Sequence, residues 1–231
     1  MPEGLTRDYV LLYVNGREQR IYGDDVFQPA SDYLRLGLMH CGTKVVCAEG
    51  DCGACSVLIG RPSADGGKLA YVPLNSCIQY LYQLDCTHVI TVEGLGSAAC
   101  LNPVQAAMVD HHGAQCGYCT PGFVVAMTAL AERVKSGQES LCEKAVKDSL
   151  TGNLCRCTGY ESIIKAGLAV DVEGLAHFSS LYPEEAMLAA FAEQGRAALA
   201  VTPYKTLSPG SVQRHRASFA HERVARHTDY R

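Results

Sequence analysis

The sequence predicts an α+β fold, because segments with strand and turn signals precede segments with helix signals. Over residues 9–96, short β-rich runs alternate with turn-forming residues. Over residues 101–172, apolar side chains recur at helical spacing. The chain has 231 residues and 48% of them are apolar, which is enough for one ordinary domain or two small ones with cores of their own. We therefore expect a helix packed on a small mixed sheet, followed by a compact group of four short helices.

The β-rich region opens with a hairpin signal. Residues Tyr9–Val14 are β-rich, and Asn15-Gly16 is the dipeptide of a two-residue turn, so Arg17–Tyr22 is expected to return as the paired strand. A short helix is expected over residues 31–38. Further short strands are expected at residues 56–59, 68–72 and 88–92.

The helical region carries four expected helix starts. Asn102, followed by a first-turn proline and a capping-box glutamine, should begin a helix that ends at Gly113. Thr120-Pro121 should begin the next, which ends near residue 136. Two further capping boxes are expected, Ser140 with Glu143 and Thr158 with Glu161. A last helix is expected to begin at Pro183.

Charge and hydropathy exclude some classes of protein. The formal net charge is −4, which leaves no basic footprint for nucleic acid over the whole chain. No apolar run approaches the roughly 18 residues of a membrane span, and the first residues lack an export signal, so we expect a cytoplasmic protein. Residues 202–231 hold six basic and two acidic residues. This segment is interpreted as an arm lying on an acidic partner subunit, with simple disorder as the alternative.

Twelve cysteines are the most informative part of the composition. Disulfide frameworks belong to short secreted chains, so metal binding is the leading interpretation. Eight of the cysteines fall into two sets with different internal spacing. The other four are expected to be packed thiols, with Cys142 on the apolar face of its helix; they are Cys41, Cys86, Cys100 and Cys142.

The first set has the spacing C-x-x-x-x-C-x-x-C at Cys47, Cys52 and Cys55, with Cys77 further on. This is the spacing of a plant-type [2Fe-2S] ferredoxin loop with a remote fourth ligand. Glycines inside the loop permit the sharp bends that turn backbone N–H groups toward the sulfurs. The alternatives are a zinc loop or a group of buried small side chains.

The second set is a C-x-x-C at Cys116 and Cys119, followed by a C-x-C at Cys155 and Cys157. These spacings by themselves are ambiguous between zinc and an iron–sulfur cluster. Cys119 precedes the Thr120-Pro121 helix start, and Cys157 precedes the Thr158 capping box. We therefore expect two helix N-termini to converge on the four sulfurs and to stabilise an anionic cluster.

Four stretches of the chain together resemble the iron–sulfur part of the xanthine oxidase family of molybdenum hydroxylases. They are residues 42–55 (GTKVVCAEGDCGAC), 91–95 (TVEGL), 115–122 (QCGYCTPG) and 152–160 (GNLCRCTGY). The similarity runs from about residue 9 to residue 172, some 70% of the chain. One departure is Val46, which stands where the family usually has glycine.

The resemblance implies three regions and two [2Fe-2S] clusters. Residues 8–96 would form a plant-type ferredoxin domain of β-grasp fold, 97–172 a four-helix [2Fe-2S] bundle domain, and 173–231 a C-terminal extension that docks on partner subunits. The plant-type cluster would lie toward the flavin and the helical-domain cluster against the molybdopterin. The implied ligands are Cys47, Cys52, Cys55 and Cys77 for the first cluster and Cys116, Cys119, Cys155 and Cys157 for the second. Gln115 and Cys157 match positions that approach the pterin.

The resemblance also implies a function that needs other chains. The protein would carry electrons one at a time from a molybdopterin centre to FAD, and it holds no substrate-activating base. Only 59 residues follow residue 172, too few for an FAD or molybdopterin domain, so both are expected on partner subunits of a heterotrimer, often doubled. The alternatives from other classes are a free-standing ferredoxin-like carrier and a zinc-stabilised interaction module.

Overall fold

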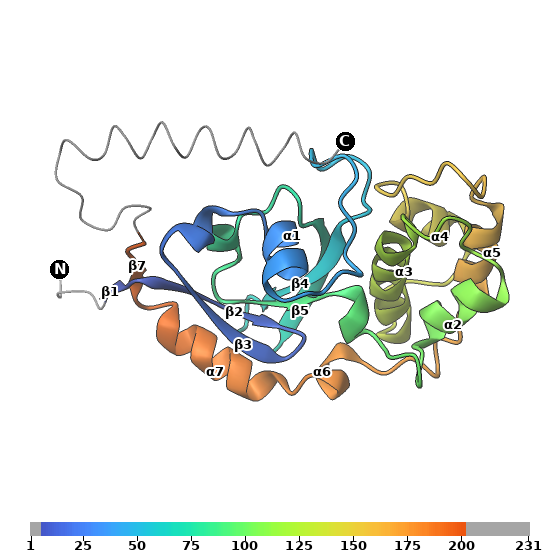
Figure 1. The fold of residues 1–231 in the computed structure, drawn as a ribbon. Coiled ribbons are helices and arrows are strands. Elements are labelled where there is room, and N and C mark those ends of the chain that lie inside the picture. Colours follow the sequence, from blue (N-terminus) through green and yellow to red (C-terminus); the bar gives the residue numbers. More distant parts are fainter. Residues whose placement is uncertain (1–5, 202–231) are drawn as a thin grey trace.

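The computed structural model describes residues 6–201, which form a mixed α/β structure (Figure 1). A five-stranded sheet lies in the N-terminal half, with strand order β3-β2-β6-β4-β5. β2 and β6 pair in parallel, and the other neighbours pair antiparallel. The strands are β2 (Tyr9–Val14), β3 (Arg17–Tyr22), β4 (Ser56–Pro62), β5 (Leu69–Asn75) and β6 (Thr87–Ile90).

The β2–β3 hairpin forms where the sequence predicts it. Val14 pairs with Arg17 across the two-residue turn. Asn15 and Gly16 both have positive φ, 48° and 77°, as the turn that matches strand twist requires. The turn therefore sets the register of the edge strand β3.

The two faces of the sheet have different covers. One face packs against α1 (Ala30–Asp32), the π-helical turn η2 (Tyr33–Gly37) and the 3₁₀ turn η3 (Leu81–Leu84). The expected helix over residues 31–38 is thus present as an α-helical turn that widens into a π-helical one. Alternate residues of β4 divide between the faces, so that Val57 and Ile59 join this core and Leu58 joins the core of the helices that follow.

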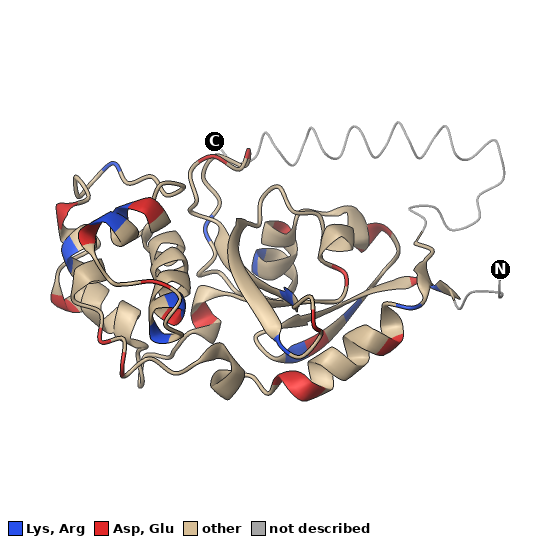
Figure 2. Cartoon of the chain, turned by 180° about the vertical axis from the view of Figure 1, so that it is seen from behind, with Lys and Arg blue, Asp and Glu red and all other residues tan. Residues whose placement is uncertain are grey.

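Four helices form a second unit, the helical unit, at the right of Figure 1. They are α2 (Pro103–Asp110), α3 (Thr120–Lys135), α4 (Glu143–Ser149) and α5 (Glu161–Leu168). α3 is the central element, because it contacts α2, α4 and the sheet strand β4. Ion pairs occupy the exposed faces of α4 and α5, where Figure 2 shows both charge colours.

Two of the four expected helix starts are confirmed. Asn102 and Gln105 form the capping box of α2, and α3 begins at Thr120. The other two capping boxes are wrong. α4 begins at Glu143 after an extended Cys142, with no side-chain cap from Ser140, and α5 begins at Glu161.

The C-terminal segment returns across both units. α6 (Phe178–Leu181) packs into the helical core, and α7 (Glu184–Gln194) packs on the sheet face at β2. β7 (Ala198–Leu199) then pairs in parallel with β1 (Thr6–Arg7), which brings the two ends of the described chain together (Figure 1). We call residues 173–199 the return segment. The basic stretch 202–231 lies outside the described residues.

None of the helices within residues 6–201 combines the length and apolar character that a membrane crossing requires.

Candidate iron–sulfur sites

The first cysteine loop brings Cys47 and Cys52 together. The N–H of Cys52 donates to the sulfur of Cys47 over 3.4 Å. Burial opposes ionisation of Cys47, but backbone N–H groups of Glu49, Cys52 and Asp51 outweigh it and lower the pKa of Cys47 to about 6. The loop is therefore preorganised to stabilise a thiolate, as metal ligation requires.

Cys55 and Cys77 form a second pair on the buried side of the same loop. The hydroxyl of Ser76 donates to the Cys55 carbonyl over 2.7 Å, which holds residue 77 beside residue 55. Burial and the adjacent Cys55 thiol raise the pKa of Cys77 to about 12. The amide of Asn75 donates to the Gly50 carbonyl over 2.6 Å and ties the loop to the end of β5.

Val46 bears on the loop because glycine usually stands there in the family. It is exposed and is not among the described non-glycine residues with positive φ. The backbone at this position therefore suits an L side chain, and the substitution does not strain the loop.

The second cysteine set also comes together as two pairs. The sulfurs of Cys116 and Cys157 lie 3.5 Å apart, and both residues are exposed. Cys119 and Cys155 lie deeper, where burial and the Cys155 thiol raise the pKa of Cys119 to about 12. One pair of this set thus faces outward and the other faces the interior.

Thr158 holds the inner cysteine Cys155. Its hydroxyl oxygen lies 3.2 Å from the Cys155 sulfur and accepts the N–H of Tyr160 over 3.1 Å. This use of the hydroxyl explains why Thr158 does not cap α5. Tyr160 has a positive φ of 69° at the N-cap position, and its own hydroxyl accepts the Cys155 N–H over 2.9 Å.

The expected convergence of two helix N-termini is half right. α3 begins directly after Cys119. α5, however, begins four residues after Cys157, because the chain from Cys157 to Tyr160 is used to hold Cys155. Only α3 therefore starts beside one of these sulfurs.

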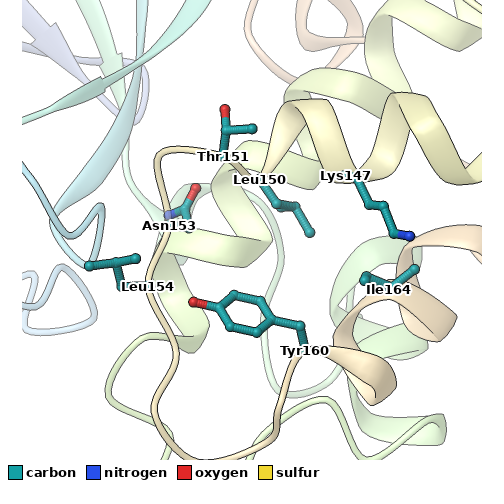
Figure 3. Close-up of a pocket in the computed structure, with 7 residues that line it drawn as sticks. All are labelled: Lys147, Leu150, Thr151, Asn153, Leu154, Tyr160 and Ile164. Atoms are coloured by element: carbon teal, nitrogen blue, oxygen red, sulfur yellow. The ribbon is translucent and has the colours of Figure 1, made fainter.

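The two cysteine loops touch each other. The N–H of Leu154 donates to the carbonyl of Cys52 over 3.0 Å. Leu154 directly precedes Cys155 in the chain, so this hydrogen bond joins Cys52 of the first set to the neighbour of a cysteine of the second set. Beside this contact is a shallow cavity of about 310 Å³, lined mainly by the segment after α4 and by Tyr160 (Figure 3).

Within residues 6–201, no three His, Cys, Asp or Glu side chains gather closely enough to hold a single metal ion. Each cysteine set is instead divided two and two. A [2Fe-2S] cluster takes four cysteine thiolates, and its two bridged irons each bind two of them. The donor set and its pairing therefore fit a two-iron cluster.

The expectation for the four remaining cysteines is largely wrong. Cys41, Cys100 and Cys142 are exposed, and Cys86 is half-buried. Cys142 lies at the N-cap of α4 rather than on its apolar face, because this helix begins one residue later. Gln115, expected to approach a pterin, lies on the surface next to the exposed Cys116.

The residues that the sequence reasoning missed are Asn153 and Tyr160. Both lie inside the stretch 152–160, in which spacing and resemblance indicate a role for the cysteines alone. Their signal was the motif itself, in which an asparagine and a tyrosine flank the C-x-C pair.

Two paired thiol sets on touching loops are the donor arrangement that an iron–sulfur protein requires. In agreement, residues 91–168 match the family model described as a [2Fe-2S] binding domain. Over 158 residues the chain is 41% identical to xanthine dehydrogenase 1 of Arabidopsis thaliana, covering 68% of this chain and 11% of the relative. Over 161 residues it is 42% identical to aldehyde oxidase 1 of Oryctolagus cuniculus, covering 68% and 12%.

Solved structures agree with these relatives. An aldehyde oxidoreductase from Desulfovibrio gigas aligns with a TM-score of 0.61 and 33% identity, covering 75% of this chain and 18% of that one. Quinoline 2-oxidoreductase from Pseudomonas putida 86 aligns with a TM-score of 0.57 and 30% identity, covering 82% of this chain and 98% of the matched one.

The chain belongs to the xanthine oxidase family of molybdenum hydroxylases and corresponds to its [2Fe-2S] iron–sulfur portion. It spans about a tenth of the length of the curated relatives it matches, which are oxidoreductases by name.

Proposed function

We propose that this chain is the electron-transfer subunit of a molybdenum hydroxylase. Residues 8–96 would be a β-grasp ferredoxin domain that holds one [2Fe-2S] cluster, and residues 97–172 a four-helix domain that holds another. The ligands would be Cys47, Cys52, Cys55 and Cys77 for the first cluster and Cys116, Cys119, Cys155 and Cys157 for the second. Each cluster, when bound, would accept and release one electron.

The observation that carries this proposal is the two-by-two pairing of both cysteine sets on loops that touch. Backbone N–H groups already favour the thiolate of Cys47. The hydrogen bond from Leu154 to the Cys52 carbonyl links the two loops over 3.0 Å. The chain thus supplies both the ligands and a short connection between the sites.

The exposed pair, Cys116 and Cys157, supports a direction for the transfer. These cysteines and Gln115 lie on the surface, while Cys119 is half-buried and Cys155 is buried. We propose that Gln115 and Cys157 approach a molybdopterin on a large partner subunit and that the first cluster delivers electrons to FAD on a medium subunit.

Partner subunits are proposed because the curated relatives are far longer than this chain. The matched chain of quinoline 2-oxidoreductase, by contrast, is covered over 98% of its length. That match supports a separate iron–sulfur chain, and we propose that it assembles with the two other subunits as a heterotrimer or a doubled heterotrimer.

Iron analysis and electron paramagnetic resonance of the purified complex test this function. We expect about four irons per chain, two for each cluster, and two separable [2Fe-2S] signals after reduction. Cys77→Ser should remove the signal of the first cluster and leave the second reducible by substrate, whereas Cys100→Ser, at an exposed spare cysteine, should keep both.

Three results would contradict the proposal. A single signal at full iron content would exclude two distinct clusters. A colourless protein with zinc and no iron would favour a zinc-stabilised interaction module. A chain that purifies without molybdenum or flavin subunits, and still exchanges electrons with several proteins, would favour a free-standing ferredoxin-like carrier.

A further inference from the structure

Asn153 is a buried amide between the two cysteine sets. It lies between the end of α4 and Cys155, and the residue is only 6% exposed. Figure 3 shows it beside Leu154 on the segment that faces the part of the chain with the five-stranded sheet, which we call the N-terminal unit. Its side-chain nitrogen donates to the carbonyl of Gly53 over 3.1 Å, across 100 residues of sequence.

The Gly53 carbonyl is an anchor point of the first cysteine loop. It also accepts the N–H and the hydroxyl of Ser56, over 3.1 Å and 2.7 Å. Those two bonds stay inside the N-terminal unit. The Asn153 bond is therefore the side-chain contact by which the helical unit holds this carbonyl.

Two glycines let the units approach this closely. Gly53 has a φ of +69°, and a Cβ there would collide with the Gly152 carbonyl and the Asn153 amide. A Cβ at Gly122, in the first turn of α3, would collide with the Gly53 carbonyl. The Gly53 peptide is thus enclosed by α3 on one side and by residues 152–153 on the other.

We propose that Asn153 is a positioning residue that sets the separation of the two clusters. Its side-chain amide donates to the carbonyl of Gly53, the residue after Cys52, and Asn153 itself stands two residues before Cys155. It touches no proposed ligand sulfur in the described contacts, so its role is the spacing of the loops and not ligation. This inference rests on the proposed function, because it needs both clusters.

The proposal is tested on the intact complex with two variants and one matched control. Asn153→Asp keeps the shape but places a carboxylate oxygen against the Gly53 carbonyl oxygen. Asn153→Ala removes the donor without adding repulsion. Asn102→Asp makes the same chemical change at the bond to the Thr128 hydroxyl, which joins two residues of the helical unit over 3.4 Å and lies outside both cysteine loops.

The measurement is the magnetic interaction between the two reduced clusters at low temperature. Dipolar coupling falls with the cube of the separation, so a small displacement of the loops changes it measurably. We expect the dipolar splitting of the cluster signals to narrow in both Asn153 variants, more in Asn153→Asp, and to keep its wild-type width in Asn102→Asp. Iron content should be unchanged in all of them.

Each outcome is decisive. Wild-type splitting in both Asn153 variants, or equal narrowing in Asn102→Asp, overturns the inference while the proposed function stands. Loss of a cluster from both Asn153 variants but not from the control also overturns it, because Asn153 would then be needed for binding the cluster. Absence of two signals in the wild-type complex would instead contradict the proposed function.

Discussion

The Thr158 hydroxyl has two defined neighbours, the sulfur of Cys155 in the C-x-C pair and the N–H of Tyr160 after it. Because its oxygen accepts the Tyr160 N–H, its hydrogen is free to donate to the Cys155 sulfur 3.2 Å away. A coordinated thiolate can only accept. Hydrogen bonds to cluster sulfurs stabilise the more negative, reduced state and so tune the potential.

Thr158→Val should therefore lower the reduction potential of the helical-domain cluster. If the hydrogen bond favours the reduced state tenfold, the decrease is about 59 mV for one electron. Thr158→Ser should restore most of it. Potentiometric titration monitored by electron paramagnetic resonance measures the change. The control is Thr151→Val, because the Thr151 hydroxyl donates to the Asp148 carbonyl at the end of α4. An unchanged potential in Thr158→Val would refute this role.

His88 is a fully buried imidazole in the middle of the sheet. Its Nε2 accepts the N–H of Gly16 over 3.0 Å, so the ring is neutral with its proton on Nδ1, 2.8 Å from the Tyr71 hydroxyl. Burial lowers the pKa of His88 to about 4. Protonation would place a hydrogen against the Gly16 N–H.

This burial makes the stability of the fold depend on pH. The ordinary histidine pKa is about 6.5, so between pH 6.5 and 4 the unfolded state binds a proton that the folded state does not. The free energy of unfolding should therefore decrease as the pH is lowered from 6.5 to 4, and the total decrease at pH 4 should be about 3 kcal/mol. Denaturant titrations at several pH values should show this slope in the wild type and a flatter one in His88→Gln; parallel curves would show that His88 is not responsible.

The helix α7 covers a face of the sheet for which the sequence predicts no covering element. Met187 and Phe191 pack on Leu11 and Leu69. The ring of Phe191 meets Tyr13 edge to face, with centroids 5.7 Å apart. The sequence predicts a C-terminal extension that docks on partner subunits, whereas in the structure α7 packs its apolar side chains on the sheet of its own chain.

Phe191→Ala should therefore destabilise the N-terminal unit. Removing a buried phenylalanine leaves a cavity and costs about 3 kcal/mol or more. Chemical denaturation followed by circular dichroism measures the loss, and Glu193→Gln, an exposed change on the same helix, should alter stability by less than about 0.5 kcal/mol. A near-neutral Phe191→Ala would mean that α7 contributes little to this core.

Elements with strong local signals could be predicted from the sequence. The hairpin at Asn15-Gly16, the capping box at Asn102 and the start of α3 all depend on neighbouring residues. The parallel pairing of β2 with β6 and the path of the return segment depend on contacts between distant residues, which no local pattern contains. The membership of the cysteine sets followed from spacing and resemblance, but their pairing two and two needed the folded loops.

At the scale of the whole molecule, Arg7 joins the start of the described chain to its end. This buried guanidinium donates to Asp85 and to the carbonyls of Tyr9 and Gln194, the last over 3.2 Å. The hydrogen bond to Asp85 raises the pKa of Arg7, so the guanidinium stays charged. Asp85 also accepts the N–H of Leu11 over 3.0 Å, which fixes its carboxylate under β2.

Arg7→Ala should be strongly destabilising, because it leaves the partly buried Asp85 carboxylate without its cation. Breaking such a pair costs about 3 kcal/mol. Thermal or urea unfolding of the variant measures the cost, and Arg20→Ala, which removes an exposed ion pair with Glu18, should leave the midpoint unchanged. Equal effects of the two changes would show that burial of the Arg7 pair does not matter.

The position of α7 has a consequence for the order in which the chain folds during its synthesis. Leu11 is made early and Phe191 late, yet the two pack together. The sheet face that α7 covers therefore stays open to solvent and to chaperones while the entire helical unit is translated. Insertion of a cluster at the first cysteine loop has to take place while this face of the sheet is still uncovered. Otherwise it has to wait until nearly all of the described chain has left the ribosome.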